Sequence, residues 1–312
     1  MNGPVGTSVV VIGSGVRAAA LADALAPRNS VSRWGEELDS VNGPRTAPGV
    51  AELMIVCVED YEAAVRILER AEPHLGSGDL VNVTSGTEAQ ARRLAAWVDA
   101  RGGRYLDGAL MAHPEHVGKP GTMLVYSGSH EVFARHERLL GQLGGAIYLG
   151  PDPGTAALYD VAMLNFAWAT LTGYLYSAAL LRTAGVRATG TAPLLTHWMS
   201  ATITSVITDY AGQIDNGRYP GDEEWLELDA PLMDHLVEAA EERGIDTELP
   251  RLIRALTHRG IAAGYGADSF ASLIDVIATS ARPGHDPAPT GARAQRAGHA
   301  VVSDPPPWGS GT

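Results

Sequence analysis

Cysteine is almost absent from this sequence. Cys57 is the only cysteine among 312 residues, so no disulfide can form within the chain and a disulfide-stapled fold is excluded. Cys57 lies inside the apolar run Leu53–Val58, where a thiol behaves as a small hydrophobic side chain. We therefore expect Cys57 to be buried in the core.

Positive charge is also scarce, and lysine is the scarcest basic residue. Lys119 is the only lysine against 22 arginines, and the formal net charge is −13. A nucleic-acid-binding protein needs a basic surface to neutralise phosphates, so the charge excludes that class. The N-terminal residues also lack the charged-then-apolar pattern of a secretory signal. We expect a soluble, cytoplasmic protein.

One long apolar segment is present, Pro153–Leu181, and it predicts a continuous helix. Pro153 fits the first turn of a helix, and no other proline follows until Pro193. Such a helix would be about 45 Å long and apolar on nearly every face, so both sides need cover. A membrane span is the alternative, which the polar residues inside the segment disfavour: Asp160, Asn165, Thr170 and Thr172. We expect a helix that joins two domains and packs against the second subunit of a homodimer.

A glycine motif follows the first predicted strand, Ser8–Ile12. The residues GSGVRA match G-x-G-x-x-G/A at the start of a helix. Gly13 permits a tight turn, Gly15 lets a pyrophosphate approach the backbone, and the helix N-terminus favours the anion. Val16 and Arg17 open the helix, and Arg17 either faces a phosphate or points to solvent. The motif therefore predicts a dinucleotide-binding site.

Strands and helices alternate as far as Gly150, and only helices follow. The alternation predicts an α/β fold, with an N-terminal Rossmann-type doubly wound domain whose parallel-type sheet is covered on both faces. A long interdomain helix and an all-α C-terminal domain come next, with helices expected over Ala192–Gly217, Gly221–Arg243, Glu248–Gly264 and Ser269–Ile277. The expected domains are 1–152, 153–183 (the helix), 184–280 and a Pro- and Gly-rich disordered tail, 281–312.

Several stretches of the chain resemble the imine reductases of the β-hydroxyacid dehydrogenase superfamily. They are VNVTSGT (Val81–Thr87), DGALMAHPEHVGKPGTMLVYSG (Asp107–Gly128), LGPDPGTAALYDVAML (Leu149–Leu164), YAGQIDNGRYPG (Tyr210–Gly221) and GIAAGYGADSFASLIDVI (Gly260–Ile277). The resemblance implies a domain-swapped homodimer and hydride transfer from NADPH or NADH to a C=N bond. It also implies that Thr84, Ser85 and Gly86 lie beside the nicotinamide. Hydroxyacid dehydrogenases of the superfamily carry a catalytic lysine on the central helix, and its absence here favours the imine branch.

The sequence departs from the family's pattern after the second strand. Imine reductases usually carry an Asn-Arg-Thr-like cluster there for the 2′-phosphate, whereas this chain has Gly35, Glu36 and Glu37. Arg33, just before them, is the nearest basic candidate for cofactor binding. The segment Leu38–Val50 is also shorter than the family's, as if the second helix were missing. These departures predict that NADPH or NADH binds weakly or not at all.

The family's proton-donor position differs as well. By spacing it falls on Asn165, whose amide can orient a substrate but cannot act as a general acid. Tyr176 shares a stripe of the helix with Asn165, whereas Asp160 points to the far side. Tyr176 is therefore the candidate proton donor, and a packed tyrosine with a purely structural role is the alternative.

Three polar residues follow the fifth predicted strand, and they offer other acid–base groups. His113, Glu115 and His116 stand close together, and two imidazoles and a carboxylate can transfer protons at neutral pH. Ordinary surface histidines are the alternative. The His-x-x-His spacing has no third ligand, so we expect no metal site.

These observations leave several functions open. The first is an NADPH- or NADH-dependent imine reductase that makes a cyclic or secondary amine in small-molecule biosynthesis. The second is a redox-silent relative that carries out cyclisation or isomerisation through His113, Glu115 or His116 without a cofactor. The third is a ligand-binding or regulatory protein with no turnover.

Overall fold

The computed structural model describes residues 6–35, 51–75 and 78–279. The predicted absence of a helix after the second strand and the predicted disordered tail both fall outside these residues. The described chain forms two compact units, one up to Phe166 and the other from Ala167. The domain boundaries expected from the sequence remain predictions.

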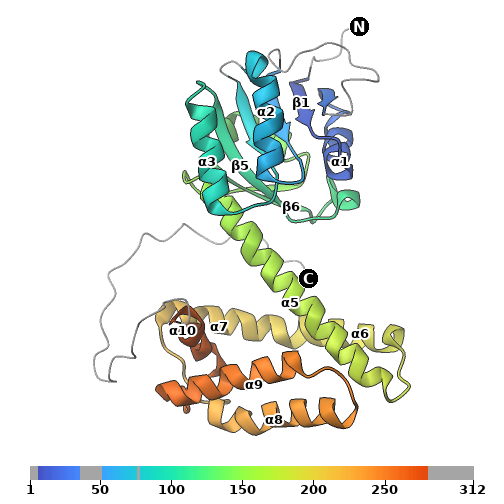
Figure 1. Ribbon diagram of the computed structural model, residues 1–312, viewed down its shortest axis with the longest axis vertical. Helices are drawn as coiled ribbons and strands as arrows, with labels where there is room; N and C mark the ends of the chain where they lie inside the picture. Colours follow the sequence, from blue (N-terminus) through green and yellow to red (C-terminus); the bar gives the residue numbers. More distant parts are fainter. Residues whose placement is uncertain (1–5, 36–50, 76–77, 280–312) are drawn as a thin grey trace. The chain divides into compact units, whose positions relative to one another are not determined.

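The first unit is built around a seven-stranded sheet with the strand order β2-β1-β3-β4-β5-β6-β7. Its elements are β1 (Ser8–Ile12), α1 (Val16–Leu25), β2 (Ser30–Trp34), β3 (Leu53–Val56), α2 (Tyr61–Leu75), β4 (Asp79–Asn82), α3 (Glu88–Asp99), β5 (Arg104–Leu110), the 3₁₀ turn η3 (Pro114–His116), β6 (Met123–Gly128), α4 (His130–Leu140) and β7 (Gly145–Tyr148). The expected Rossmann-type domain is confirmed (Figure 1).

Two strands, β6 and β7, run against the other five, which corrects the expected parallel-type sheet. β6 pairs antiparallel with β5, with Leu110 opposite Leu124, while the other neighbouring strands pair parallel. A parallel pair needs a long crossover, usually through a helix, but only a loop with the short turn η3 joins β5 to β6. The chain therefore returns along the sheet in the opposite direction.

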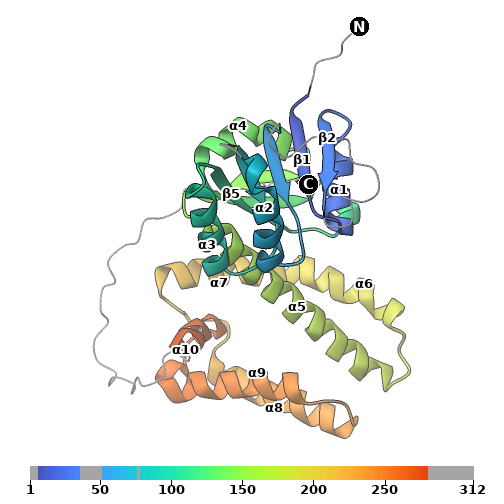
Figure 2. The same cartoon turned by 45° about the horizontal axis from the view of Figure 1, so that its top comes forward.

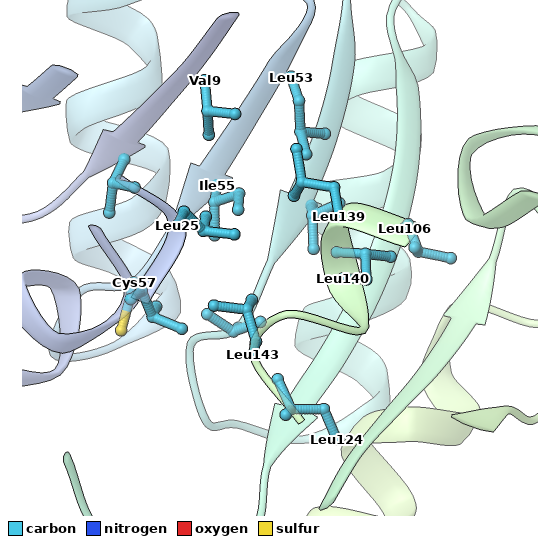
Figure 3. Packing of buried hydrophobic residues seen from close by; sticks show 14 of the residues in the cluster. Val9, Leu25, Leu53, Ile55, Cys57, Leu106, Leu124, Leu139, Leu140 and Leu143 are labelled. Carbon is cyan, nitrogen blue, oxygen red and sulfur yellow. The ribbon is translucent and has the colours of Figure 1, made fainter. Parts of the chain in front are cut away.

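Buried side chains cover both faces of the sheet. One cluster joins the strands to α1 and α4 and includes Leu25, Leu106 and Leu140, and Figure 3 shows this packing around Cys57. A second cluster joins the strands to α2 and α3 through side chains such as Leu68. Cys57 is 4% exposed, so its expected burial is confirmed.

The second unit is helical, as the sequence predicts. It contains the rest of α5 (Gly154–Arg182), then α6 (Ala188–Trp198), the π-helical turn η4 (Met199–Ile203), α7 (Thr204–Asn216), α8 (Leu226–Glu242), α9 (Glu248–Gly260), the π-helical turn η5 (Ile261–Tyr265), η6 (Phe270–Ser272) and α10 (Leu273–Thr279). Within this unit α8 and α9 lie side by side (Figure 2).

Helix boundaries differ from the sequence expectation at two places. The helix expected from Ala192 begins at Ala188, with Pro193 in its interior, and the helix expected from Gly221 begins only at Leu226. A Cβ on Gly221 would lie 2.2 Å from the carbonyl oxygen of Ala267, so this glycine serves a close backbone approach before the helix.

The long helix is continuous over the expected segment. α5 has 29 residues. No single described helix is long and apolar enough to cross a membrane, and only the pair Glu248–Tyr265 and Phe270–Thr279, bent by 88°, passes on length and composition.

Candidate active site at the carboxyl edge of the sheet

The glycine turn after β1 is determined by a close backbone approach. Gly13 has φ +147°, and a Cβ there would lie 2.1 Å from the carbonyl oxygen of Cys57, at the end of β3. The Gly13 N–H donates to the Trp34 carbonyl at 2.8 Å. Only glycine fits this position, because any side chain would separate β1 from β3.

The first turn of α1 faces open space. Gly15 is its N-cap and has no side chain, and a Cβ on Gly15 would meet no atom within 4 Å. No side chain caps the helix, and Val16 is 74% exposed although it is apolar. A helix N-terminus of this kind can accept an anion on its backbone N–H groups.

Arg33 lies against the same turn. Its Nη2 donates to the carbonyl oxygens of Ser14 at 3.2 Å and Gly13 at 3.4 Å. The sequence offers Arg33 as the nearest basic candidate for cofactor binding, and from the end of the edge strand β2 its side chain reaches the glycine turn. Glu36 and Glu37 are outside the described residues.

The loop between β4 and α3, Thr84–Gly86, lies at the carboxyl ends of the neighbouring parallel strands. At its start, the Thr84 N–H donates to Asn82 Oδ1 at 3.3 Å, and the Thr84 hydroxyl oxygen accepts from the Val58 N–H at 3.2 Å. In its middle, a Cβ on Gly86 would lie 2.5 Å from the ring of Tyr61.

A capping box fixes the end of this loop. The Thr87 N–H donates to Gln90 Oε1 at 2.8 Å, and the Gln90 N–H donates to Thr87 Oγ1 at 3.4 Å. The reciprocal bonds satisfy two backbone donors at the start of α3, so the loop meets the helix at a defined angle.

Polar groups fasten the start of α5 to the first unit. Arg92 on α3 makes a bidentate pair with Asp152, with Nε–Oδ1 at 2.9 Å and Nη2–Oδ2 at 2.7 Å. Asp152 Oδ1 also accepts from the Gly154 N–H at 3.0 Å, and Ser127 Oγ accepts from the Ala156 N–H at 2.8 Å. The first turns of α5 are therefore held in a fixed orientation.

This orientation buries Asp160 in the first unit. Asp160 is 4% exposed, and its carboxyl group lies close enough to Ser85 for the Ser85 side chain to act on its pKa. Burial raises the pKa of Asp160, and the Ser85 side chain and the positive charge of Arg17 oppose this shift without cancelling it. The result is a buried acid beside the loop Thr84–Gly86.

Arg17 belongs to the same group of residues. Its charge acts on both Asp160 and Cys57, and burial is the main reason why the pKa of the Cys57 thiol is raised. The Arg17 Nε atom is buried and has no hydrogen-bond partner in the part of the chain that the structure describes. The side chain thus lies toward the carboxyl edge of the sheet, whereas the sequence left open a phosphate or solvent.

Sequence reasoning missed Asp160 as a site residue. It assigned Asp160 to the far side of the helix from Asn165 and used it only to argue against a membrane span. A single carboxylate inside an otherwise apolar helix was the available signal, because a buried charge of this kind is costly unless it has a function or a partner.

The structure places the predicted acid–base residues elsewhere. Asn165 is exposed on α5. The Tyr176 hydroxyl donates to Asp246 and accepts from the Leu249 N–H at 3.4 Å, which ties α5 to the start of α9 inside the second unit. The bond to Asp246 is the main cause that raises the pKa of Tyr176. The catalytic roles assigned to Asn165 and Tyr176 remain predictions.

The three polar residues after β5 lie at the surface. His113, Glu115 and His116 are exposed in and beside η3. In the described part of the chain, no group of three or more His, Cys, Asp or Glu side chains could hold a metal ion. The acid–base role of these three residues remains a prediction.

The fold and the site together define a dinucleotide-dependent oxidoreductase of the Rossmann type. The family model of the C-terminal domain of NADPH-dependent reductive aminase-like proteins matches residues 152–279. The chain belongs to the imine reductase family of enzymes, which includes the NADPH-dependent reductive aminases. The resemblance seen in the sequence is thereby confirmed.

Known relatives cover most of the chain. An NADPH-dependent reductive aminase of Aspergillus oryzae is 35% identical over 228 residues, which is 72% of this chain and 77% of the relative. A reductive aminase of Aspergillus terreus, solved with NADPH and ethyl levulinate, is 31% identical with a TM-score of 0.80, over 88% of this chain and 100% of that one. An imine reductase of Bacillus cereus is 32% identical with a TM-score of 0.76, over 87% and 99%.

The residues of the first unit fit a nicotinamide dinucleotide. The glycine turn leaves the side of Gly15 open, and the first turn of α1 carries no side-chain cap. Because the carboxyl ends of β1, β3 and β4 share one edge of the sheet, the turn and the loop Thr84–Gly86 lie along the same edge. This edge is where doubly wound sheets bind their ligands.

Proposed function

We propose that this protein is an NADPH- or NADH-dependent imine reductase that transfers a hydride to the carbon of a cyclic or secondary imine. The observation that carries the proposal is the buried carboxyl group of Asp160, which lies beside Ser85 at the edge of the sheet that holds the glycine turn. Membership of the imine reductase family supports the reaction class.

Different residues of the chain bind the cofactor and transfer the proton. Gly13, Gly15 and the first turn of α1 hold the pyrophosphate, and the loop Thr84–Gly86 lies beside the nicotinamide. The cofactor supplies the hydride when it is bound. Asp160 holds a proton, because burial raises its pKa, and delivers it to the nitrogen of the product amine.

Asp160 replaces Tyr176 as the proposed proton donor for a physical reason. A general acid is most effective when its pKa lies near the working pH. Burial moves the pKa of Asp160 upward toward that range, whereas the bond to Asp246 moves the pKa of Tyr176 further above it. Asn165 keeps its proposed role in orienting the substrate.

We also propose that the protein is a homodimer. Large apolar side chains are exposed along α5, among them Trp168 at 65%, Leu175 at 63% and Leu171 at 50%, and Leu232 on α8 is 55% exposed. A monomer rarely exposes apolar side chains in such number, and a second copy would cover them. Sedimentation at micromolar concentration should give the dimer mass, and a stable folded monomer would contradict the proposal.

The cofactor-independent alternative has less support. It requires His113, Glu115 or His116 to act in an enclosed site, and all three side chains are exposed. Acid–base catalysis of cyclisation or isomerisation needs the reacting groups held away from water. The geometry therefore favours the reductase.

A direct assay tests the proposed function. The purified protein is incubated with NADPH or NADH and a cyclic imine, or with a ketone and a primary amine, and the loss of reduced cofactor is matched to the amine formed. We expect turnover with the cyclic imine. Calorimetry with both cofactors completes the test, because no binding of either would contradict the proposal and favour the cofactor-independent alternative.

A further inference from the structure

A buried polar network lies behind the loop Thr84–Gly86, and Asp107 is its centre. Asp107 is on β5, opposite Asn82 on β4, and is 1% exposed. Its Oδ1 atom accepts hydrogen bonds from Tyr105 at 2.5 Å, Tyr61 at 2.7 Å and Asn82 at 3.2 Å. Among the described residues, its buried Oδ2 atom has no hydrogen-bond partner. A buried carboxyl oxygen that accepts three hydrogen bonds holds the three donor side chains in position.

One connection to the loop runs through Asn82. Because the Asn82 Nδ2 group donates to Asp107, the amide can take only one orientation, and its Oδ1 atom then faces the Thr84 N–H at 3.3 Å. Thr84 in turn accepts from the Val58 N–H at 3.2 Å. Asp107 thus determines where the loop begins.

The other connection runs through Tyr61. Its hydroxyl is fixed on Asp107 at 2.7 Å, and its ring lies directly against Gly86, where a Cβ would approach Cδ2 and Cε2 to 2.5 Å. If the hydroxyl lost its partner, the ring would be free to move and Gly86 would lose the surface on which it rests. Asp107 thus also determines the position of the loop at Gly86 relative to the Tyr61 ring.

Tyr105 provides a natural control for these two connections. Its hydroxyl donates to the same Oδ1 atom, at 2.5 Å, and it lies on β5 beside Asp107. In the described part of the chain, no hydrogen bond joins Tyr105 to Thr84, Ser85 or Gly86. Tyr61 and Tyr105 therefore make the same bond to Asp107, but of the two only Tyr61 lies against Gly86 in the loop.

We infer that Asp107 is a positioning residue for the reductase reaction, which holds the loop Thr84–Gly86 in place through Asn82 and Tyr61. The inference rests on the proposed function, because it assigns this loop to the nicotinamide. Asp107 acts without touching substrate or cofactor. It places Ser85, and through Ser85 it fixes the carboxyl group of Asp160.

The ionisation of Asp107 and the ionisation of Asp160 are coupled. Burial raises the pKa of Asp107 to about 7, against the effect of its three hydrogen bonds, and Asp160 raises it further when Asp160 is ionised. Tyr61 and Tyr105 face Asp107 from α2 and β5, and Arg17 faces Asp160 from α1. Interaction between two carboxyl groups is reciprocal, so each one favours the protonated form of the other.

The test compares Tyr61→Phe with Tyr105→Phe. Both variants remove one hydroxyl bond to Asp107, so a purely structural network predicts equal effects. We expect Tyr61→Phe to lower kcat and NADPH affinity about tenfold or more, as is typical for loss of a supporting partner behind a site. Tyr105→Phe should change kcat and NADPH affinity by less than about threefold. Its Tm should decrease by about as much as the Tm of Tyr61→Phe. Equal kinetic losses in the two variants would overturn the inference.

Two substitutions at Asp107 separate geometry from charge. Asp107→Asn keeps an acceptor oxygen for the tyrosine hydroxyls, whereas Asp107→Ala removes it. We expect the Asn variant to recover most of the NADPH affinity that the Ala variant loses, and equal losses would contradict positioning through Oδ1.

A hydrogen-exchange experiment without cofactor tests this inference independently of the proposed function. The exchange of the Thr84–Thr87 amides is measured by mass spectrometry in the parent and both tyrosine variants, without cofactor. Faster exchange in Tyr61→Phe alone supports the positioning role even if the parent binds no NADPH, in which case only the proposed function fails. Unchanged exchange in Tyr61→Phe overturns the inference.

Discussion

Asp160, two turns into the long helix α5, lies beside Ser85 in the loop that follows β4. The contact depends on the anchoring of α5 by Asp152 and Ser127, which fixes the rotation of the helix about its axis. It brings an acid from the long helix to the carboxyl edge of the sheet, so that one edge combines an anion site and a proton source.

Replacing Asp160 by Asn should remove the proton donor while keeping the shape of the side chain. We expect kcat to decrease about 100-fold or more, because general acid catalysis typically contributes that much. In the parent enzyme, activity should decline as the pH rises through the raised pKa of Asp160, since the acid must be protonated. Steady-state kinetics across a pH series measures both effects, and the Asn variant should lack this alkaline decline.

Asn165→Ala and Tyr176→Phe serve as comparisons for the Asp160 variant. Asn165→Ala should raise KM with little change in kcat, because an amide orients the substrate without supplying a proton. Tyr176→Phe should leave kcat near that of the parent, since its hydroxyl is bonded to Asp246. A large loss of kcat in Tyr176→Phe together with a small one in Asp160→Asn would assign the proton to Tyr176.

Arg33→Ala should weaken the binding of NADPH and NADH by similar factors. The Arg33 guanidinium is bonded to the carbonyls of Gly13 and Ser14, so it supports the turn that receives the pyrophosphate, which both cofactors share. Calorimetric titration of parent and variant with each cofactor measures the change. A loss confined to NADPH would instead show that Arg33 binds the 2′-phosphate.

Asp107 should make stability depend on pH below neutrality. Its pKa is about 7 in the folded protein against an ordinary 3.8, so the folded state binds the proton more tightly. The stability that this group contributes is complete below about pH 4 and declines as the pH rises to about 7, by about 4 kcal/mol at most. Urea unfolding of parent and Asp107→Asn across this range measures it. The variant should gain stability relative to the parent as the pH rises, and parallel curves would contradict the assignment.

We expect Asp79 to be the charged residue of the first unit whose substitution lowers the free energy of unfolding most. Its buried carboxylate is bonded to Arg104 at 2.6 Å, Arg135 at 2.7 Å and His136 at 2.7 Å. Burial opposes ionisation, but the bonds from His136 and the two arginines outweigh it and lower the pKa of Asp79. Asp79→Asn should therefore cost about 1–3 kcal/mol of unfolding free energy at neutral pH, because it weakens the bond to the buried His136, while the two partly exposed arginines can turn to water.

Glu131→Gln is the matched control for Asp79. Glu131 also pairs with Arg135 but is exposed, so its loss should cost less than about 1 kcal/mol. Since the folded-state pKa of Asp79 is lowered, the stability from this carboxylate is present at neutral pH and is lost as the pH falls through that pKa. Chemical denaturation at neutral and acidic pH would show a difference between parent and Asp79→Asn that shrinks in acid, and a constant difference would contradict this account.

The elements that depend on local pattern could be predicted from the sequence. Alternation of strands and helices, the glycine turn at Gly13, the continuous helix α5 and the helical second unit are all expected from periodicity and from glycine and proline positions. The motifs shared with imine reductases also identified the family. The strand direction of β6 and β7 was the exception, because two neighbouring strands look alike in sequence whichever way they run.

Which side chains meet at the site depends on contacts between distant segments, which the sequence pattern does not show. Helical spacing gives the angle between Asp160 and Asn165 around α5, but the face that turns toward the sheet is set by the Arg92–Asp152 pair and the Ser127 bond. Likewise, nothing local relates Tyr61 to Gly86 or to Asp107, since these residues come together only through the pairing of β4 with β5 and the packing of α2. Contacts between distant segments depend on the packing of the whole core, and no periodicity within one segment records them.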